Sequence, residues 1–154
     1  MRSSGWVGDM TKICIFGAGA IGGYLAHALH KAGAEVVLIA RGAHLEAIKE
    51  NGLTFIKEGQ RETFKMRATD EPEELGPQDY VISALKAHSV APIADQFQSL
   101  LADHTAIVPA VNGIPWWYFH KSESGTSLEN KWLETVDPDG VQWKTFGPER
   151  AIGC

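Results

Sequence analysis

The fold of this chain is decided by the stretch Lys12-Ile13-Cys14-Ile15-Phe16-Gly17-Ala18-Gly19-Ala20-Ile21-Gly22-Gly23. It begins with a short apolar run of residues that favour β-strands and continues directly into the pattern Gly-x-Gly-x-x-Gly. Apolar residues then recur at helical spacing until the pattern stops at Ala32-Gly33. The stretch therefore predicts a strand, a tight glycine turn and a helix, in that order.

Each glycine of the turn has a separate physical task. Gly17 allows the chain to reverse, Gly19 lets the backbone approach a pyrophosphate, and Gly22 lets the helix pack closely on the strand. The start of the helix offers free backbone N–H groups and the positive end of the helix dipole to phosphates. The turn therefore predicts a dinucleotide site, and a purely structural glycine turn is the alternative.

The remaining apolar segments alternate between strand patterns and helix patterns. The expected elements are strands over 35–40, 80–85 and 105–111, helices over 43–51 and 90–102, a hairpin pairing 53–56 with 63–68, and a turn at 137–140 between short strands 133–136 and 141–143. Nearly continuous apolar strands that alternate with helices are typical of parallel sheets covered on both faces. We therefore predict an α/β fold with a Rossmann-type, doubly wound, mainly parallel sheet and helices on both faces.

Length and composition fit one globular domain of 154 residues with 44% apolar and 21% charged residues. We expect residues 1–9 to be a flexible leader and residues 10–154 to form the domain. A net charge of −5 gives no reason to expect nucleic acid or an anionic membrane as a partner. No apolar run approaches the roughly 20 residues that span a bilayer.

The chain contains two cysteines, Cys14 and Cys154, which do not resemble a disulfide framework or a metal cluster. We therefore expect a reduced, cytoplasmic compartment and no metal site. His27 and His30 lie one helical turn apart without a cysteine or carboxylate partner, so we expect them to be exposed helix residues.

The end of the second strand indicates which dinucleotide is bound, because ligands of open α/β sheets lie over the carboxyl ends of the strands. Sites for NAD or FAD usually have an acidic residue there that binds the ribose hydroxyls. This chain has Arg41 instead, and a guanidinium group binds a 2′-phosphate that a carboxylate would repel. We therefore predict NADP, with a solvated surface charge as the alternative role of Arg41.

The sequence resembles the N-terminal half of the ketopantoate reductase (2-dehydropantoate 2-reductase) family. The segments that carry the resemblance are 13–23, 37–41, 81–88 and 111–115. The resemblance implies that the glycine turn holds the pyrophosphate and that Lys86 and Asn112 orient the nicotinamide end, with Asn112 also near the substrate. The expected cofactor-binding residues are Gly17, Ala18, Gly19, Ala20, Ile21, Gly22, Arg41, Lys86 and Asn112.

Simple structural roles remain as alternatives for the last two residues. Lys86 could be a surface charge at a helix start, and Asn112-Gly113 could be a plain turn. The family often has glutamine where this chain has Ser89, so the contact made at that position is open.

The resemblance implies NADPH-dependent reduction of a small 2-oxo acid, of the ketopantoate to pantoate type, in pantothenate and coenzyme A biosynthesis. It also implies that a catalytic lysine and glutamate belong to a helical C-terminal domain that is absent from this chain. We therefore expect no catalytic residue here and interpret the chain as the cofactor-binding half. The alternative is a non-catalytic NADP(H)-binding module, or a truncated family member that acts on a different substrate.

An aromatic cluster at 116–119 favours a branch of the family with a substrate other than ketopantoate. Its tryptophans fit core or interdomain packing better than a substrate pocket. We expect the surface left by the absent domain to expose Trp116 and Trp117 and to favour a homodimer.

Overall fold

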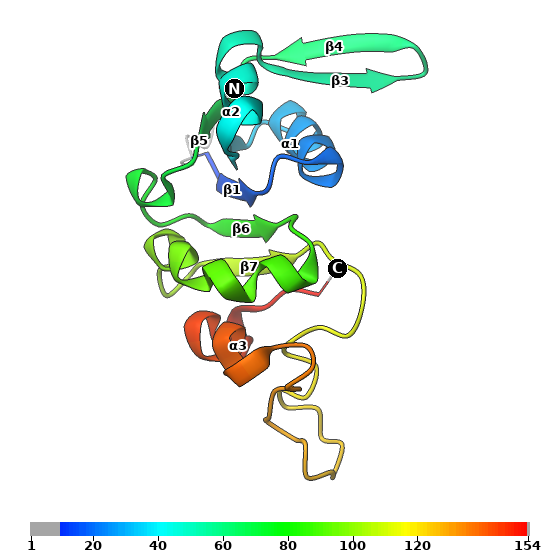
Figure 1. Cartoon of the computed structure of the whole chain (residues 1–154), viewed down its shortest axis with the longest axis vertical. Coiled ribbons are helices and arrows are strands. Elements are labelled where there is room, and N and C mark those ends of the chain that lie inside the picture. Colours follow the sequence, from blue (N-terminus) through cyan, green and yellow to red (C-terminus); the bar gives the residue numbers. More distant parts are fainter. Residues whose placement is uncertain (1–9, 154) are drawn as a thin grey trace, which may run out of the picture.

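The protein is described by a computed structural model that covers residues 10–153 (Figure 1). Five parallel strands form the central sheet in the order β5-β2-β1-β6-β7. They are β1 (Lys12–Phe16), β2 (Glu35–Ile39), β5 (Arg67–Thr69), β6 (Tyr80–Ser83) and β7 (Ala106–Pro109). The strand order runs outward in both directions from β1 and β6, which confirms the predicted doubly wound parallel sheet.

Both faces of the sheet are covered, because alternate side chains of each strand point to opposite sides. Ile13 and Ile15 of β1 belong to a core beneath α1 (Ala20–Lys31) and α2 (Gly42–Asn51). Cys14 and Phe16 belong to a second core beneath the 3₁₀ segment η3 (Ala91–Leu100) and α3 (Val141–Phe146). The expectation of helices on both faces is therefore confirmed.

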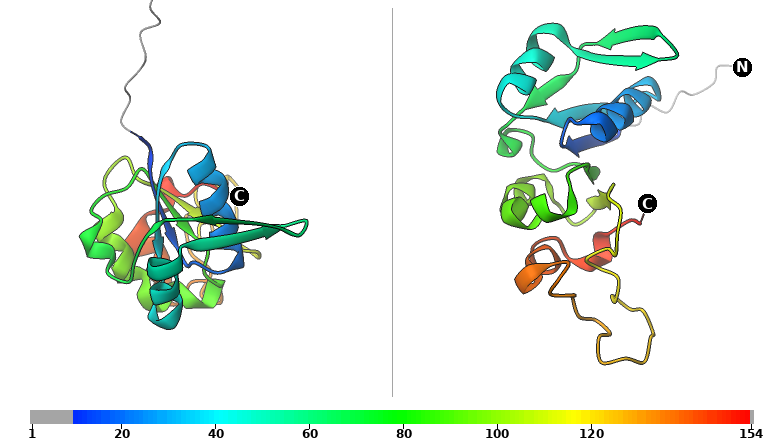
Figure 2. Two further views of the ribbon diagram at one scale, coloured as in Figure 1. Left: turned by 90° about the horizontal axis from the view of Figure 1, so that it is seen from above. Right: turned by 45° about the vertical axis from the view of Figure 1, so that its right-hand side comes forward.

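The predicted hairpin exists, but its second strand is shorter than expected. β3 (Leu53–Lys57) and β4 (Gln60–Phe64) form a separate antiparallel sheet that extends away from the body of the protein (Figures 1 and 2). The expected strand over 63–68 is divided, because Arg67–Thr69 leaves the hairpin and pairs with β2 as β5. Ala68 and Thr69 are buried in the sheet, a position that the hairpin could not give them.

The prediction of two short strands at 133–136 and 141–143, on either side of residues 137–140, is wrong. Pro138–Gly140 is a 3₁₀ turn, η4, that leads directly into the helix α3. Both carboxylate oxygens of Asp137 accept backbone N–H groups at the start of this helix, from Gln142 and Trp143, each at 2.9 Å. Such capping satisfies N–H groups that a helix cannot pair within itself, and it favours a helix here over a strand.

The predicted helix over 90–102 is confirmed as helical in its central part, although as 3₁₀ structure. η3 contains a kink at Ile93, whose φ of −127° is not helical. Two further 3₁₀ turns, η1 (Pro72–Glu74) and η2 (Ala87–Ser89), lie in connections before this segment, and a fifth, η5 (Pro148–Arg150), precedes Ala151. Ala151 makes a parallel bridge to Ile107, which places it beside β7.

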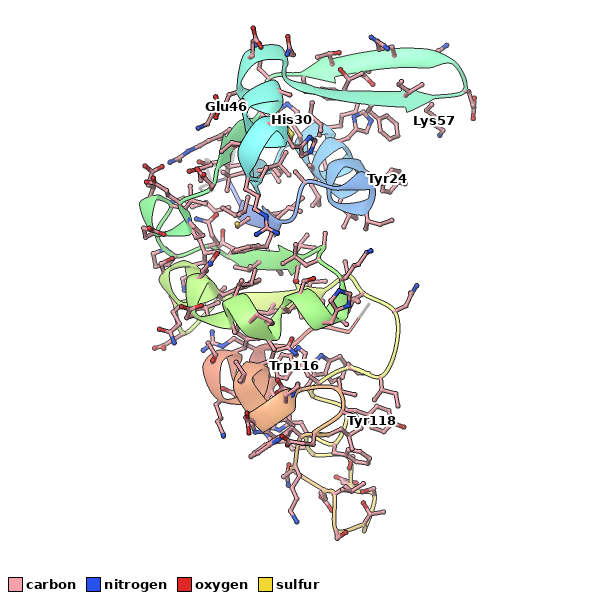
Figure 3. All side chains as sticks on the ribbon, in the orientation of Figure 1. Tyr24, His30, Glu46, Lys57, Trp116 and Tyr118 are labelled. Atoms are coloured by element: carbon pink, nitrogen blue, oxygen red, sulfur yellow. The ribbon has the colours of Figure 1, made fainter. Side chains whose placement is uncertain are left out.

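Two aromatic side chains lie elsewhere than predicted. His27 is only 12% exposed, because its ring stacks on Phe55 of the hairpin with 4.2 Å between ring centroids. His30 is exposed, as predicted. Trp116 is not exposed but buried against Phe146 of α3, with 5.7 Å between centroids (Figure 3). The expectation that Trp116 and Trp117 form an exposed surface is therefore wrong for Trp116, and Trp117 is half-buried against the second core.

The segment between β7 and α3 forms a long loop at the end of the molecule opposite to the hairpin (Figures 1 and 2). Tyr118 in this loop is 55% exposed. Among residues 10–153, no helix is both long and apolar enough to cross a membrane. The leader expected at residues 1–9 lies outside the described residues.

Candidate functional site

The predicted site residues follow four neighbouring strands and therefore lie along one edge of the sheet. In strand order, Arg41 follows β2, Gly17 follows β1, Lys86 follows β6 and Asn112 follows β7. With about 4.8 Å between neighbouring strands, β2 and β7 are roughly 14 Å apart. The direction of winding reverses between β1 and β6, which is where open α/β sheets bind their ligands.

Two glycines of the turn are required by the fold itself. Gly17 has a φ of +105°, a backbone conformation that residues with a Cβ rarely adopt. Its N–H donates to the Ile39 carbonyl at 3.1 Å. A Cβ on Gly22 would collide with the carbonyl oxygen of Gly17 and would lie 3.2 Å from the Cβ of Ala84. The close packing of helix on strand therefore explains both residues without any ligand.

Gly19 is different, because nothing in the fold requires a glycine there. Its backbone is extended, with φ −71° and ψ −167°, and a Cβ on it would meet no atom within 4 Å. A larger residue could stand there without strain. The position is therefore empty space directly in front of the first turn of α1, where a ligand can reach the backbone.

The starts of both flanking helices are suited to an anion. Gly19 is the N-cap of α1 and Arg41 the N-cap of α2, and neither makes a side-chain capping hydrogen bond within residues 10–153. Neither helix has an acidic residue in its first turn. Their leading N–H groups and dipoles are thus available to negatively charged groups.

The three polar side chains predicted for this site are all exposed. Arg41, Lys86 and Asn112 form no side-chain hydrogen bond or ion pair within the described part of the chain. Lys86 is the N-cap of η2, and Asn112 precedes Gly113, whose φ of +112° turns the chain away from β7. These groups can therefore bind a ligand without first breaking an internal bond.

A groove of about 580 Å³ lies next to Asn112. Apolar side chains form most of its walls, with Thr135, His88 and Asp139 as the other polar groups. The apolar residues are Ala87, Ala91, Pro92, Ile114, Val136, Pro138 and Val141. Its chemistry suits the apolar part of a small molecule whose polar end contacts Asn112.

One contact of the site was not identified from the sequence. The ring Nε2 of His44, in the first turn of α2, lies 2.8 Å from the carbonyl oxygen of Ala18 in the glycine turn. His44 follows Arg41 by three residues, but a bond between residues 26 positions apart leaves no local pattern. The contact is visible only in the folded structure, where the first turn of α2 lies beside the glycine turn.

Metal-binding and thiol chemistry find no support in the described residues. Residues 10–153 contain no group of three or more histidine, cysteine or acidic side chains that could hold a metal ion. Cys14 is a free thiol in the second core, and burial raises its pKa from 9.0 to about 12. It is therefore neither ionised nor accessible at neutral pH.

Comparison with known proteins identifies one family. The model described as ketopantoate reductase PanE/ApbA matches residues 13–115. A 2-dehydropantoate 2-reductase from Mesorhizobium japonicum is 54% identical over 143 residues, which cover 92% of this chain and 43% of that protein. The chain thus spans less than half the length of this relative.

Solved structures agree with this match. A Ralstonia solanacearum structure named for ketopantoate reductase has a TM-score of 0.85 at 39% identity, and the match covers 94% of this chain and 44% of that one. D-mandelate dehydrogenase, solved with NADH and anilino(oxo)acetate, has a TM-score of 0.63 at 33% identity, over 68% of this chain and 35% of that one. Since the family match contains the glycine turn and all four strand ends of the candidate site, the chain belongs to the ketopantoate reductase PanE/ApbA family.

Proposed function

We propose that this chain is the NADP(H)-binding half of a reductase that converts a small 2-oxo acid, of the ketopantoate to pantoate type, in pantothenate and coenzyme A biosynthesis. The observation that carries the proposal is the empty position at Gly19, in front of the uncapped start of α1. The fold does not require glycine there, whereas close approach of a pyrophosphate does.

The proposed binding mode runs along the carboxyl edge of the sheet. The backbone from Gly17 to Gly22, including Ala18, Ala20 and Ile21, would hold the pyrophosphate, and Arg41 would hold the 2′-phosphate. Lys86 and Asn112 would orient the nicotinamide end, from which bound NADPH supplies the hydride. Asn112 would also contact the 2-oxo acid, whose apolar part fits the adjoining groove.

We propose no catalytic acid among residues 10–153. Reduction of a ketone needs a group that protonates or stabilises the developing alkoxide. By resemblance to the family, that role belongs to a lysine and a glutamate outside this chain. Lys86 and Asn112 are therefore proposed to bind and orient, and not to transfer the proton.

The choice of NADPH over NADH depends on Arg41. D-mandelate dehydrogenase, a structural neighbour, was solved with NADH, so the general architecture does not decide between the two cofactors. Arg41 is exposed and has no ion-pair partner among residues 10–153. A charge-assisted bond from its guanidinium to a 2′-phosphate contributes about 1.5–3 kcal/mol, or roughly ten- to a hundredfold in affinity.

The test is a calorimetric titration of the wild-type chain and Arg41→Ala with NADPH and NADH. We expect the wild type to bind NADPH more tightly, and we expect the substitution to weaken NADPH roughly ten- to a hundredfold while NADH changes little. Arg61→Ala removes an exposed cation from the hairpin and is the matched control. Equal losses for both cofactors in Arg41→Ala would reject contact with the 2′-phosphate.

The second candidate function is reduction of a different 2-oxo acid, or cofactor binding without catalysis. The apolar groove beside Asn112 favours a substrate with a bulky apolar group. The residues proposed for proton transfer lie outside this chain, so neither function predicts NADPH oxidation by the chain alone. Calorimetric titration of the NADP⁺-loaded chain with ketopantoate and with phenylglyoxylate separates the functions, because a module without a substrate site would bind neither acid. A preference for phenylglyoxylate would move the substrate class from ketopantoate to aromatic 2-oxo acids.

Two properties of the whole protein also remain proposals. A homodimer would have to use exposed residues such as Ile114 and Tyr118, because Trp116 is buried. Sedimentation velocity over a range of concentrations tests this association. A cytoplasmic location is supported by the free thiol of Cys14 and is tested by cell fractionation.

A further inference from the structure

The contact between His44 and Ala18 joins two parts of the site that are separate in sequence. The carbonyl oxygen of Ala18 can only accept a hydrogen bond, so the ring Nε2–H of His44 must donate it across 2.8 Å. Ala18 lies inside the glycine turn, and His44 lies in the first turn of α2, beside Arg41. The bond thus links the proposed pyrophosphate turn to the proposed 2′-phosphate site.

We propose that His44 is a positioning residue for the dinucleotide, which fixes the Ala18–Gly19 peptide and holds the two phosphate-binding elements as one unit. This inference rests on the proposed function. It assigns to His44 a role at the cofactor site that acts through the backbone and requires no contact with the cofactor itself.

His44 can position the Gly19 N–H without contacting it, because both groups act on one planar peptide unit. The carbonyl of Ala18 and the N–H of Gly19 belong to the same planar unit, so a bond that fixes one group fixes the other. Gly19 lacks a side chain and tolerates many backbone angles, so this peptide rotates more easily than the others of the turn. His44 supplies the hydrogen bond that opposes such a rotation and keeps the Gly19 N–H in a constant direction.

The bond is not needed to hold α2 on the sheet. Leu45 and Ile48 of the same helix are each only 2% exposed and belong to the first core, whereas His44 is an exposed residue. Burial of two large aliphatic side chains stabilises the helix by several times more than one partly buried hydrogen bond. Loss of the ring donor should therefore change the turn and leave the fold intact.

The experiment compares His44→Phe, which keeps an aromatic ring but has no N–H, with His44→Gln, whose amide can donate in place of the imidazole. We expect His44→Phe to weaken NADPH and NADH by the same factor, about two- to tenfold, because the turn serves both cofactors. We expect His44→Gln to restore much of this affinity. The melting temperature without cofactor should match the wild type in both variants.

NMR relaxation of the backbone amides of the chain without cofactor gives an independent readout. The order parameter of the Gly19 N–H should be lower in His44→Phe than in the wild type, while that of Ala26 in the middle of α1 stays unchanged. A purely structural histidine would instead lower the melting temperature, and glutamine would not restore binding selectively.

The possible failures are distinguishable. A wild-type chain that binds neither cofactor would refute the proposed function and the binding role of His44 together. A cofactor-binding chain whose affinities are unchanged in His44→Phe would refute the role of His44 alone. A loss confined to NADPH would also overturn the inference, because it would mean direct contact with the 2′-phosphate.

Discussion

The same methyl group, added at two glycines three positions apart, should have opposite consequences. At Gly19 a Cβ meets no atom within 4 Å, and the backbone angles suit any residue. At Gly22 it collides with the Gly17 carbonyl oxygen. We therefore expect Gly19→Ala to fold normally and lose cofactor affinity, and we expect Gly22→Ala to lose stability.

The surroundings of each glycine determine how much each substitution should change the free energy of unfolding. At Gly19, alanine gains up to about 1 kcal/mol from reduced freedom of the unfolded chain but is a poorer N-cap than glycine by a similar amount. The net change in the free energy of unfolding should stay within about 1 kcal/mol, or about 4 °C in the melting temperature. At Gly22, overpacking costs typically 1–3 kcal/mol, or more where backbone must move, which lowers the melting temperature by roughly 4–12 °C.

Binding should separate the two variants just as clearly. A methyl group at Gly19 stands between the pyrophosphate and the start of α1, and loss of one charge-assisted N–H bond costs about 1.5–3 kcal/mol. Calorimetric titration should therefore show NADPH and NADH weakened together, roughly ten- to a hundredfold. Circular dichroism melts of both variants complete the comparison. Wild-type affinity in Gly19→Ala, or a wild-type melting temperature in Gly22→Ala, would refute this reasoning.

Two further predictions concern the second core and the helix that covers it. Asp137→Ala removes the acceptor for the N–H groups of Gln142 and Trp143. Urea denaturation should show the free energy of unfolding lowered by about 1–2 kcal/mol. A denaturation midpoint equal to that of the wild type would contradict the capping role. Because burial raises the pKa of Cys14 from 9.0 to about 12, its contribution to stability is complete below pH 9 and is lost as the pH rises towards 12. Iodoacetamide should accordingly leave Cys14 unmodified at pH 8 until denaturant is added, as peptide mapping would show, and rapid labelling of the native chain would contradict its burial.

The parts of the fold that the sequence predicted correctly are those with a local pattern. The apolar run, glycine turn and helix from Lys12 to Lys31 follow from residues next to one another, and so do β2, β6 and β7, although β6 and β7 each end two residues earlier than predicted. Because parallel strands bring their carboxyl ends to one edge, the predicted site residues came together without any knowledge of long-range contacts.

The wrong predictions depend on partners that are distant in the chain. The β-forming composition of 63–68 does not reveal that Phe64 pairs with Leu53 while Ala68 pairs with Leu38. His27 has the neighbours of an exposed helix residue until the hairpin packs Phe55 against its ring. The segment after Asp137 is a different case, because its carboxylate caps the helix through residues only five and six positions away, and strand propensity alone gave the wrong answer there.

The hydrogen bonds at the amino edge of the sheet stabilise the fold, whereas the proposed binding residues lie at the carboxyl edge. At the amino edge, the hydroxyl of Thr105 donates to the Gln78 carbonyl at 2.6 Å, and the Arg150 guanidinium donates to the carbonyls of Ala102 and Thr105 at 2.7 and 3.1 Å. These bonds tie together the connections that enter β6, β7 and the bridge at Ala151. The acceptors Gln78, Ala102 and Thr105 are paired within the protein there, although the Nε of Arg150 is buried without a partner among residues 10–153. Substitutions that break these bonds should therefore reduce stability.

At the carboxyl edge, the side chains of Arg41, Lys86 and Asn112 are exposed and have no such partners among residues 10–153. Replacing Arg41, Lys86 or Asn112 removes no internal bond of the described part of the chain, so the fold should change by less than about 0.5 kcal/mol. The free energy that these groups can contribute is therefore available to a ligand. This separation is the reason why the binding experiments on Arg41 and Gly19 measure the cofactor site and not the stability of the sheet.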